Sequence, residues 1–255
     1  MLVGVKWYTV AVLWTTVPAV YHCCISLCLI LNHYFASVCT DDNGCMPTVY
    51  HRVDSTCSLS DILFTANNVE AAIKRLKSNL SSGPDELPPL LFKKLGLVID
   101  QPLAILYHQL FSVSFIPPKW KHAVITPVFK KGLSSSVSNY RPISLTCVTS
   151  KIMERIISDQ MHSYILSNGL INEAQHGFLR GLSTTTNLLH CVNDWSLTLH
   201  NRHGVTIVYI DLAKAFDTVL HEKLLYRDLT WVYIKPVGCY IGLISMLAYE
   251  WQCSA

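Results

Sequence analysis

The stretch Thr206–Asp217, TIVYIDLAKAFD, decides the fold that this sequence predicts. Residues 206–210 are mostly apolar and β-branched, which predicts a short strand buried on both faces. After this strand, apolar residues recur at helical spacing, at Ala215, Phe216, Val219, Leu220 and Leu224. We therefore expect Asp211 at the carboxyl end of a buried strand, where ligands tend to bind in α/β sheets. Such a carboxylate either caps the following helix or holds a divalent metal, and the stretch alone leaves both interpretations open.

The composition favours a folded chain without a dominant charge. The 255 residues suffice for one large domain or two small ones, and 51% of them are hydrophobic. The net charge of +3 is weak, so any surface for nucleic acid must be a local basic cluster. The ten cysteines form no C-x-x-C pair and are unevenly spread, which predicts reduced, mostly buried thiols instead of a zinc site or a disulfide framework. The spacings of His176, His190 and His200 match no common metal-ligand set.

The first 31 residues form a hydrophobic segment with three interpretations. Residues 7–31 contain no Lys, Arg, Asp or Glu, and that length is enough to span a bilayer. The segment is therefore a membrane anchor, a signal sequence, or a buried or accidental stretch. Pro18, His22 and the lack of a small-residue cleavage site weigh against the first two, so a membrane location is not favoured.

Apolar periodicity predicts several helices between residues 65 and 199. Thr65 or Asn67 caps the first of them, and two more are expected around residues 90–98 and 103–111. Ser150 is expected to cap the next helix, which extends to about residue 165. A further helix over residues 184–199 is expected to face the core with five residues, Leu188, Leu189, Val192, Trp195 and Leu199.

A β-hairpin is predicted between two of these helices. Residues 123–129 and 139–145 have the pattern of strands, and a serine-rich loop separates them. The hairpin would carry Lys130, Lys131 and Arg141 close together. Such a cluster suits phosphate, because lysine acts as a point charge and arginine donates to two oxygens at once. Solubility of an exposed hairpin is the alternative interpretation, and the hairpin alone does not decide between them.

Five sequence blocks then point to a family. They are Ser82–Asp85 (SGPD), Pro118–Gly132 (with WK and TPVFKKG), Asn139–Leu145 (NYRPISL, with Lys151 and Glu154 after it), Gln175–Ser183 (QHGFLRGLS) and Tyr209–His221 (YIDLAKAFDTVLH). In content and order they resemble the reverse transcriptase domain of non-LTR (LINE-type) retrotransposons over roughly residues 32–225. One short motif would be weak support, whereas five in the family's order indicate common descent.

The resemblance implies a right-hand polymerase of the α/β (α+β) class, with the fingers and the start of the palm. It implies that Lys130, Lys131 and Arg141 contact the incoming dNTP, and that Phe216 is the bulky residue that presses on its sugar. Asp211 would be the catalytic, metal-binding carboxylate, aided by the backbone carbonyl of Leu212. The implied cofactor is Mg²⁺, and the implied partners are an RNA template and a DNA primer. The implied location is the nucleus or the cytoplasm.

The sequence departs from the family's pattern after residue 225. No PQG-type block and no adjacent pair of aspartates follows Asp211, and residues 226–255 do not align with the family's motifs. Residues 241–249 either cover the open edge of the palm sheet or were read past a splice junction or frameshift, and we favour the second interpretation. The predicted organisation is a hydrophobic segment (1–31), an N-terminal extension (32–96), fingers (97–204), the first palm strand and helix (205–225) and an unmatched tail (226–255).

The sequence therefore predicts a fragment of a retrotransposon RNA-directed DNA polymerase, truncated after its first catalytic block and inactive by itself, because one carboxylate cannot build a two-metal site. Two alternatives remain: a residual nucleic-acid-binding module without catalysis, and a membrane-anchored protein.

Overall fold

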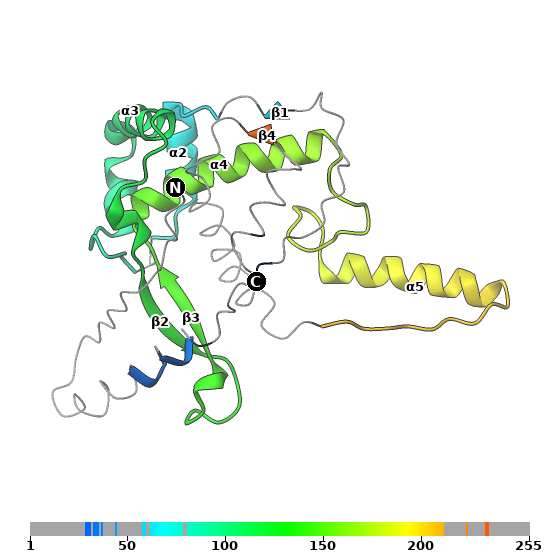
Figure 1. Ribbon diagram of the computed structural model, residues 1–255. Coiled ribbons are helices and arrows are strands. Elements are labelled where there is room, and N and C mark those ends of the chain that lie inside the picture. The colour runs from blue at the N-terminus through cyan, green and yellow to red at the C-terminus, as the bar shows by residue number, and fades with distance from the viewer. Residues whose placement is uncertain are drawn as a thin grey trace. The chain divides into compact units, whose positions relative to one another are not determined.

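The computed structural model describes residues 29–31, 33–35, 37, 44, 58–59, 62–78, 81–211, 223 and 233–234 (Figure 1). The chain divides into two compact units, which are described separately: residues 1–160 with 214–255, and residues 161–213. Helices and strands both occur, which confirms the predicted mixed α/β class.

Three helices build the core of the first unit: α2 (Ala66–Arg75), α3 (Pro89–Ser112) and α4 (Val148–Ser167). Thr65 caps α2 as predicted, because its side-chain oxygen accepts a hydrogen bond from the Asn68 backbone N–H at 3.2 Å. The two helices predicted around residues 90–98 and 103–111 form the single helix α3, which is kinked at Gly96. This helix therefore runs across the predicted domain boundary between residues 96 and 97.

The centre of this core is a cluster of aromatic rings around Tyr107 of α3. The Tyr107 ring centroid lies 5.9 Å from that of Phe64 and 6.1 Å from that of Trp120. Its hydroxyl donates a hydrogen bond of 2.8 Å to the Thr149 carbonyl of α4. Burial raises the pKa of Tyr107, and the nearby carboxylate of Glu154 raises it further. Tyr107 therefore stays a neutral donor that joins α3 to α4.

Polar contacts join the same helices at the surface. Arg75 at the end of α2 pairs with Asp159 of α4 at 2.7 Å. The Gln160 side chain accepts from the Leu63 N–H and donates to the Leu63 carbonyl, both at 2.9 Å. The segment that leads into α2 is thus held on α4 by its backbone.

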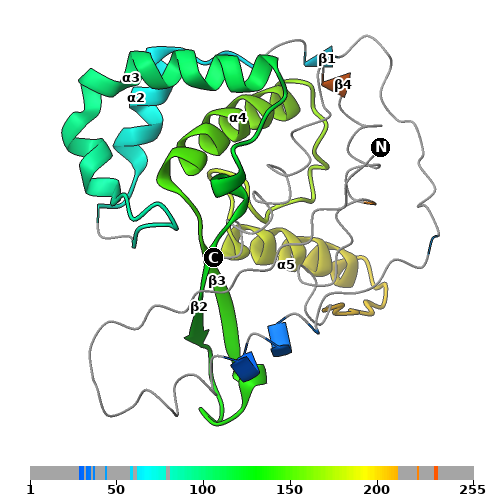
Figure 2. The ribbon, with the colours of Figure 1, turned by 60° about the vertical axis from the view of Figure 1, so that its left-hand side comes forward.

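The hairpin consists of β2 (Val124–Phe129) and β3 (Tyr140–Leu145), and it projects away from the three helices (Figure 2). Before β2, the short 3-10 helix η1 (Pro118–Lys121) places Trp120 in the aromatic cluster. After β3, the backbone of Thr146 and Cys147 passes directly under Gly83, and the Cys147 thiol donates to the Lys119 carbonyl at 3.6 Å. Both strands are therefore anchored to the core at the same end of the hairpin.

Cys147, at this anchor, is a free and buried cysteine, which agrees with the predicted reduced and buried thiols. Burial raises its thiol pKa to about 11, and the charge of the neighbouring Asp85 adds to the rise. The thiol is thus protonated near neutral pH and acts as a donor within the anchor.

Two short strands complete the first unit. β1 (Ser58–Leu59) pairs in parallel with β4 (Tyr233–Ile234), with Ser58 opposite Tyr233. This pairing joins residues far apart in the sequence.

The second unit contains the end of α4 and the helix α5 (Thr184–His200), which begins with a capping box formed by Ser183 and Thr186. The prediction that α5 faces a core is wrong for four of its five residues: the side chains of Leu188, Leu189, Val192 and Leu199 are exposed, and Trp195 is half-buried. In the described part of this unit, no second apolar layer packs against the helix.

The strand predicted at residues 205–211 is also not formed. Residues 203–211 have no regular secondary structure and run back along α5 (Figure 1). Val208, Tyr209 and Ile210 are at least 75% exposed. A strand buried on both faces needs a sheet with layers packed on both of its faces, and no described residues pair with this segment or cover it.

The start of α4, the membrane segment and the tail remain to be compared with the sequence predictions. Ser150 does not cap α4: the helix begins at Val148, and the buried Ser150 hydroxyl donates to Glu154 inside it. Among the helices that the structure describes, none is long and apolar enough to cross a membrane. Residues 7–28, the helix predicted after residue 215 and most of the tail 226–255 lie outside the described residues.

The anchor at Gly83 gives a prediction about stability. A Cβ atom at this position would lie 2.6 Å from the Cys147 backbone nitrogen and would also overlap the Thr146 carbonyl. We expect Gly83→Ala to lower the free energy of unfolding by about 1–3 kcal/mol, measured by urea denaturation of the purified chain, because the backbone must move. Gly204→Ala is the matched control, since nothing lies within 4 Å of its Cβ position. Equal stability of the Gly83→Ala and Gly204→Ala chains would contradict the prediction.

Candidate functional site

The register of the hairpin determines which side chains share a face. Val128 lies opposite Arg141, and Phe129 lies opposite Tyr140. Pro127 lies opposite Pro142. Hydrogen-bonded and non-hydrogen-bonded pairs alternate along an antiparallel ladder, and a proline, which has no N–H, is accommodated in a non-hydrogen-bonded pair. The Lys130 N–H donates to the Asn139 carbonyl at 2.8 Å, so that pair is hydrogen-bonded and the Pro127–Pro142 pair, three positions away, is not. The two prolines therefore fit within the hairpin without breaking it.

The loop that closes the hairpin is held by its own hydrogen bonds. The Tyr140 hydroxyl donates to the Ser134 carbonyl at 2.9 Å, and the Asn139 side chain donates to the Leu133 carbonyl at 2.9 Å. Gly132 has a φ of +94°, and a Cβ there would lie 2.7 Å from the Asn139 side-chain nitrogen. Glycine is needed at this turn, which directly follows the two lysines.

The structure brings Lys130 and Arg141 together, as the sequence predicted. Alternation along the strands places both side chains on the face of Val128, and Lys131 follows in the bend. All three cations are exposed, and the ion pairs found in the described part of the chain include none of them. Their charges are therefore available to an anion from solvent.

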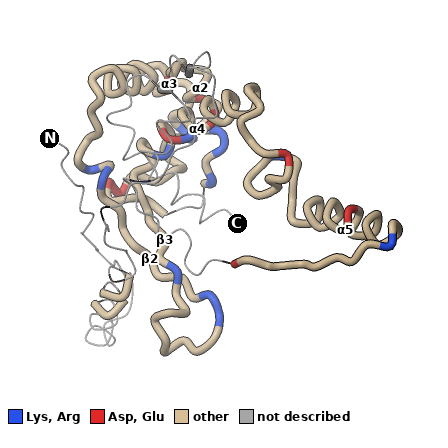
Figure 3. Tube along the Cα trace, turned by 45° about the vertical axis from the view of Figure 1, so that its right-hand side comes forward, with Lys and Arg blue, Asp and Glu red and all other residues tan. Residues whose placement is uncertain are grey.

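The charge around the hairpin is one-sided. Residues 101–153 contain no Asp or Glu, and six Lys or Arg residues, which are Lys119, Lys121, Lys130, Lys131, Arg141 and Lys151. In Figure 3 the outer part of the hairpin carries only Lys and Arg among its charged residues. A local positive surface thus exists on a chain whose net charge is only +3.

Asp211 belongs to the second unit and is exposed at the end of the irregular segment 203–211. Leu212 and Phe216 lie outside the described residues. In the part of the chain that the structure describes, no three His, Cys, Asp or Glu side chains are grouped so that they would hold a metal ion. Among the described residues, Asp211 is therefore not grouped with other metal-ligating side chains.

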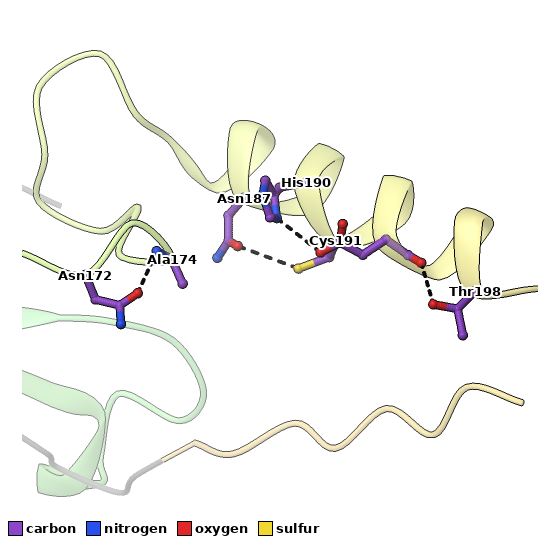
Figure 4. A network of polar contacts seen from close by, with 7 residues as sticks. Asn172, Ala174, Asn187, His190, Cys191 and Thr198 are labelled. Carbon is purple, nitrogen blue, oxygen red and sulfur yellow. Dashed lines mark hydrogen bonds and ion pairs between the residues drawn. The ribbon is translucent and has the colours of Figure 1, made fainter. Parts of the chain in front are cut away.

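The polar side chains of α5 are engaged in local contacts (Figure 4). His190 Nδ1 lies 3.4 Å from the Asp194 carboxylate, and the Cys191 thiol donates to Asn187 at 3.7 Å. His176 Nδ1 lies 3.0 Å from the Thr186 hydroxyl. These groups stabilise the helix and its preceding turn.

Several motif residues have roles that sequence reasoning missed. Gly83 and Trp120 belong to two of the five blocks, and both anchor the hairpin. Lys119 and Lys121 lie beside Trp120 in η1, at the anchored end of the hairpin. The absence of acidic residues between positions 101 and 153 is the sequence signal that would have pointed to Lys119 and Lys121.

Comparison with known proteins agrees with these motifs. The family described as reverse transcriptase (RNA-dependent DNA polymerase) matches residues 128–251, which includes part of the tail that the motifs left unaligned. The probable RNA-directed DNA polymerase from transposon BS of Drosophila melanogaster is 31% identical over 157 residues, covering 61% of this chain and 17% of that protein.

Two further relatives come from mobile elements. The RNA-directed DNA polymerase from mobile element jockey of Drosophila melanogaster is 30% identical over 164 residues, covering 64% of this chain and 18% of that protein. The Pol polyprotein from the type-1 retrotransposable element R2 of Popillia japonica is 28% identical over 109 residues, covering 43% of this chain and 15% of that protein. The chain thus spans less than a fifth of the length of these relatives. Residues 128–251 of the chain are therefore similar to the reverse transcriptase (RNA-dependent DNA polymerase) family, and these relatives are polymerases of mobile elements of the non-LTR retrotransposon kind.

Proposed function

We propose that the β2–β3 hairpin is the phosphate-binding part of the fingers of a retrotransposon reverse transcriptase. Lys130, Lys131 and Arg141 would hold the triphosphate of the incoming deoxynucleotide or the backbone of the template. The observation that carries this proposal is a group of exposed cations, none in a described ion pair, on a hairpin whose loop is braced by its own hydrogen bonds.

The chemistry of these side chains suits phosphate oxygens. The Arg141 guanidinium can donate to two oxygens at once, and the two lysines contribute point charges beside it. No carboxylate in residues 101–153 competes for them. Within the part of the chain that the structure describes, the hairpin can therefore bind phosphate without first breaking an ion pair.

The remaining roles are proposed from the motifs. The family implies nucleotidyl transfer with a divalent metal and the binding of a nucleic-acid template. For the whole enzyme we propose DNA synthesis on an RNA template from a DNA primer, with Mg²⁺ as the metal. Asp211 would be a metal-binding carboxylate beside the Leu212 carbonyl, and Phe216 would contact the sugar of the dNTP.

A second candidate is a module that binds nucleic acid without catalysing its synthesis. Two observations favour this binding module. The hairpin that carries the cations is fully formed, whereas Asp211 is exposed and no described residues complete a metal site around it.

The hairpin proposal predicts salt-dependent binding of nucleic acid. We expect Lys130→Ala/Lys131→Ala/Arg141→Ala to weaken binding of a labelled single-stranded RNA, measured by fluorescence anisotropy across a salt series. Because about 0.7 of a counterion is released per contacted phosphate, the slope of log affinity against log salt should fall by about 2.

The matched control is Lys77→Ala/Lys94→Ala/Arg155→Ala, which removes the same charges from exposed positions outside the hairpin. It should bind almost as tightly as the parent chain. An affinity that does not change between low and high salt, or equal losses in both triple variants, would refute the proposal.

The state of Asp211 predicts a result for catalysis. We expect the purified 255-residue chain to show no Mg²⁺-dependent primer extension, because transfer with two metals needs more than one carboxylate. The assay uses an RNA template, a DNA primer and all four dNTPs. Extension that is abolished by Asp211→Ala would show instead that the chain completes the site by itself.

A further inference from the structure

A second group of cations lies at the anchored end of the hairpin. Lys119 and Lys121 flank the buried Trp120 in η1, immediately before β2. Lys119 is exposed and Lys121 is half-buried, and the ion pairs of the described chain include neither. Because Trp120 packs on Tyr107 and the Lys119 carbonyl accepts from Cys147, this basic turn is held at the base of the hairpin.

The two groups are separated by the length of a strand. Nine residue steps lead from position 121 to position 130, which corresponds to about 30 Å along a fully extended path. A nucleic-acid strand advances about 3.4 Å per phosphate when it is helical and more when it is extended, so roughly nine nucleotides or fewer would bridge the two groups. A single triphosphate is too short to contact both.

The strand between the two groups is accessible and carries no Lys, Arg, Asp or Glu. On the face that carries Lys130 and Arg141, Thr126 and Val128 are both exposed, with an exposed fraction of 42% for Val128. The unstacked bases of a single strand are free to contact these side chains, whereas the bases of a duplex are stacked within it. The hairpin thus carries cations at both ends of an uncharged strand, and Asp85, beside Cys147, is a carboxylate at the anchored end.

We propose that Lys119 and Lys121 form a second phosphate-binding position, so that the hairpin binds single-stranded nucleic acid along its whole length. This inference rests on the proposed function of Lys130, Lys131 and Arg141 and extends it. One bound strand engages the outer and the anchored cations simultaneously. Affinity should therefore rise with strand length until the strand reaches both groups, because the second contact becomes intramolecular.

The test measures affinity against strand length, with single-stranded RNAs of increasing length and inorganic tripolyphosphate as a competitor. We expect Lys119→Ala/Lys121→Ala to leave tripolyphosphate and the shortest RNAs bound as in the parent chain. For RNAs that reach both groups, the salt slope should fall by about 1.4, since two phosphate contacts are lost. Lys119→Arg/Lys121→Arg should restore the parent behaviour, because it retains both charges.

Controls separate this inference from misfolding and from the proposed function. Lys77→Ala/Lys94→Ala removes two exposed lysines elsewhere and should not change the length dependence. Lys119→Gln/Lys121→Gln keeps most of each side chain, and its thermal unfolding should match that of the parent chain while its binding matches that of the alanine variant. The same length dependence in Lys119→Ala/Lys121→Ala as in the parent chain would overturn the inference.

The remaining outcomes are also decisive. If the triple variant at Lys130, Lys131 and Arg141 binds like the parent chain, the proposed function fails. If that variant loses affinity but the lysines of η1 have no effect, only this inference fails. A duplex that binds more tightly than a single strand of equal length, with the same sensitivity to Lys119 and Lys121, would overturn the assignment to single strands.

Discussion

The close packing of Gly83 on the backbone of Thr146 and Cys147 is the contact on which the candidate site depends. It holds the end of β3 against the loop before α3, and Trp120 holds the start of β2 in the aromatic cluster. The hairpin is thus fixed at one end and free at the other. A phosphate-binding loop benefits from this arrangement, because cations that are already positioned lose less conformational freedom when an anion binds.

The blocks of the sequence that resemble the family's motifs contain two kinds of residue. Gly83, Trp120 and the half-buried Tyr140 support the backbone, whereas Lys130, Lys131 and Arg141 are exposed to solvent. The Tyr140 hydroxyl bonds the Ser134 carbonyl and so braces the loop that carries the cations. Exposed cations and residues that hold the backbone therefore occur within the same short motifs. A motif match alone does not show which of the two roles a residue has.

The two units differ in how completely they bury their apolar residues. In the first unit, α2, α3 and α4 enclose a core that includes Val69, Tyr107 and Ile152. In the second unit, α5 has no buried residues, and the segment before Asp211 is exposed as well. Hydrophobic burial is the main favourable term in folding, so the first unit has a clear source of stability. The chain spans less than a fifth of the length of these relatives.

The sequence by itself determined the family, the α2 helix with its Thr65 cap, the hairpin and the grouping of Lys130 with Arg141. These features follow from local rules, because apolar period, capping residues and strand alternation act over a few residues. Only the tertiary structure decided that Gly83 and Trp120 anchor the hairpin, since those contacts join residues far apart in the chain. It also decided that α5 and the segment before Asp211 are exposed. An apolar pattern predicts which face would be buried, but a second surface must be present to bury it, and that surface is a property of the folded chain.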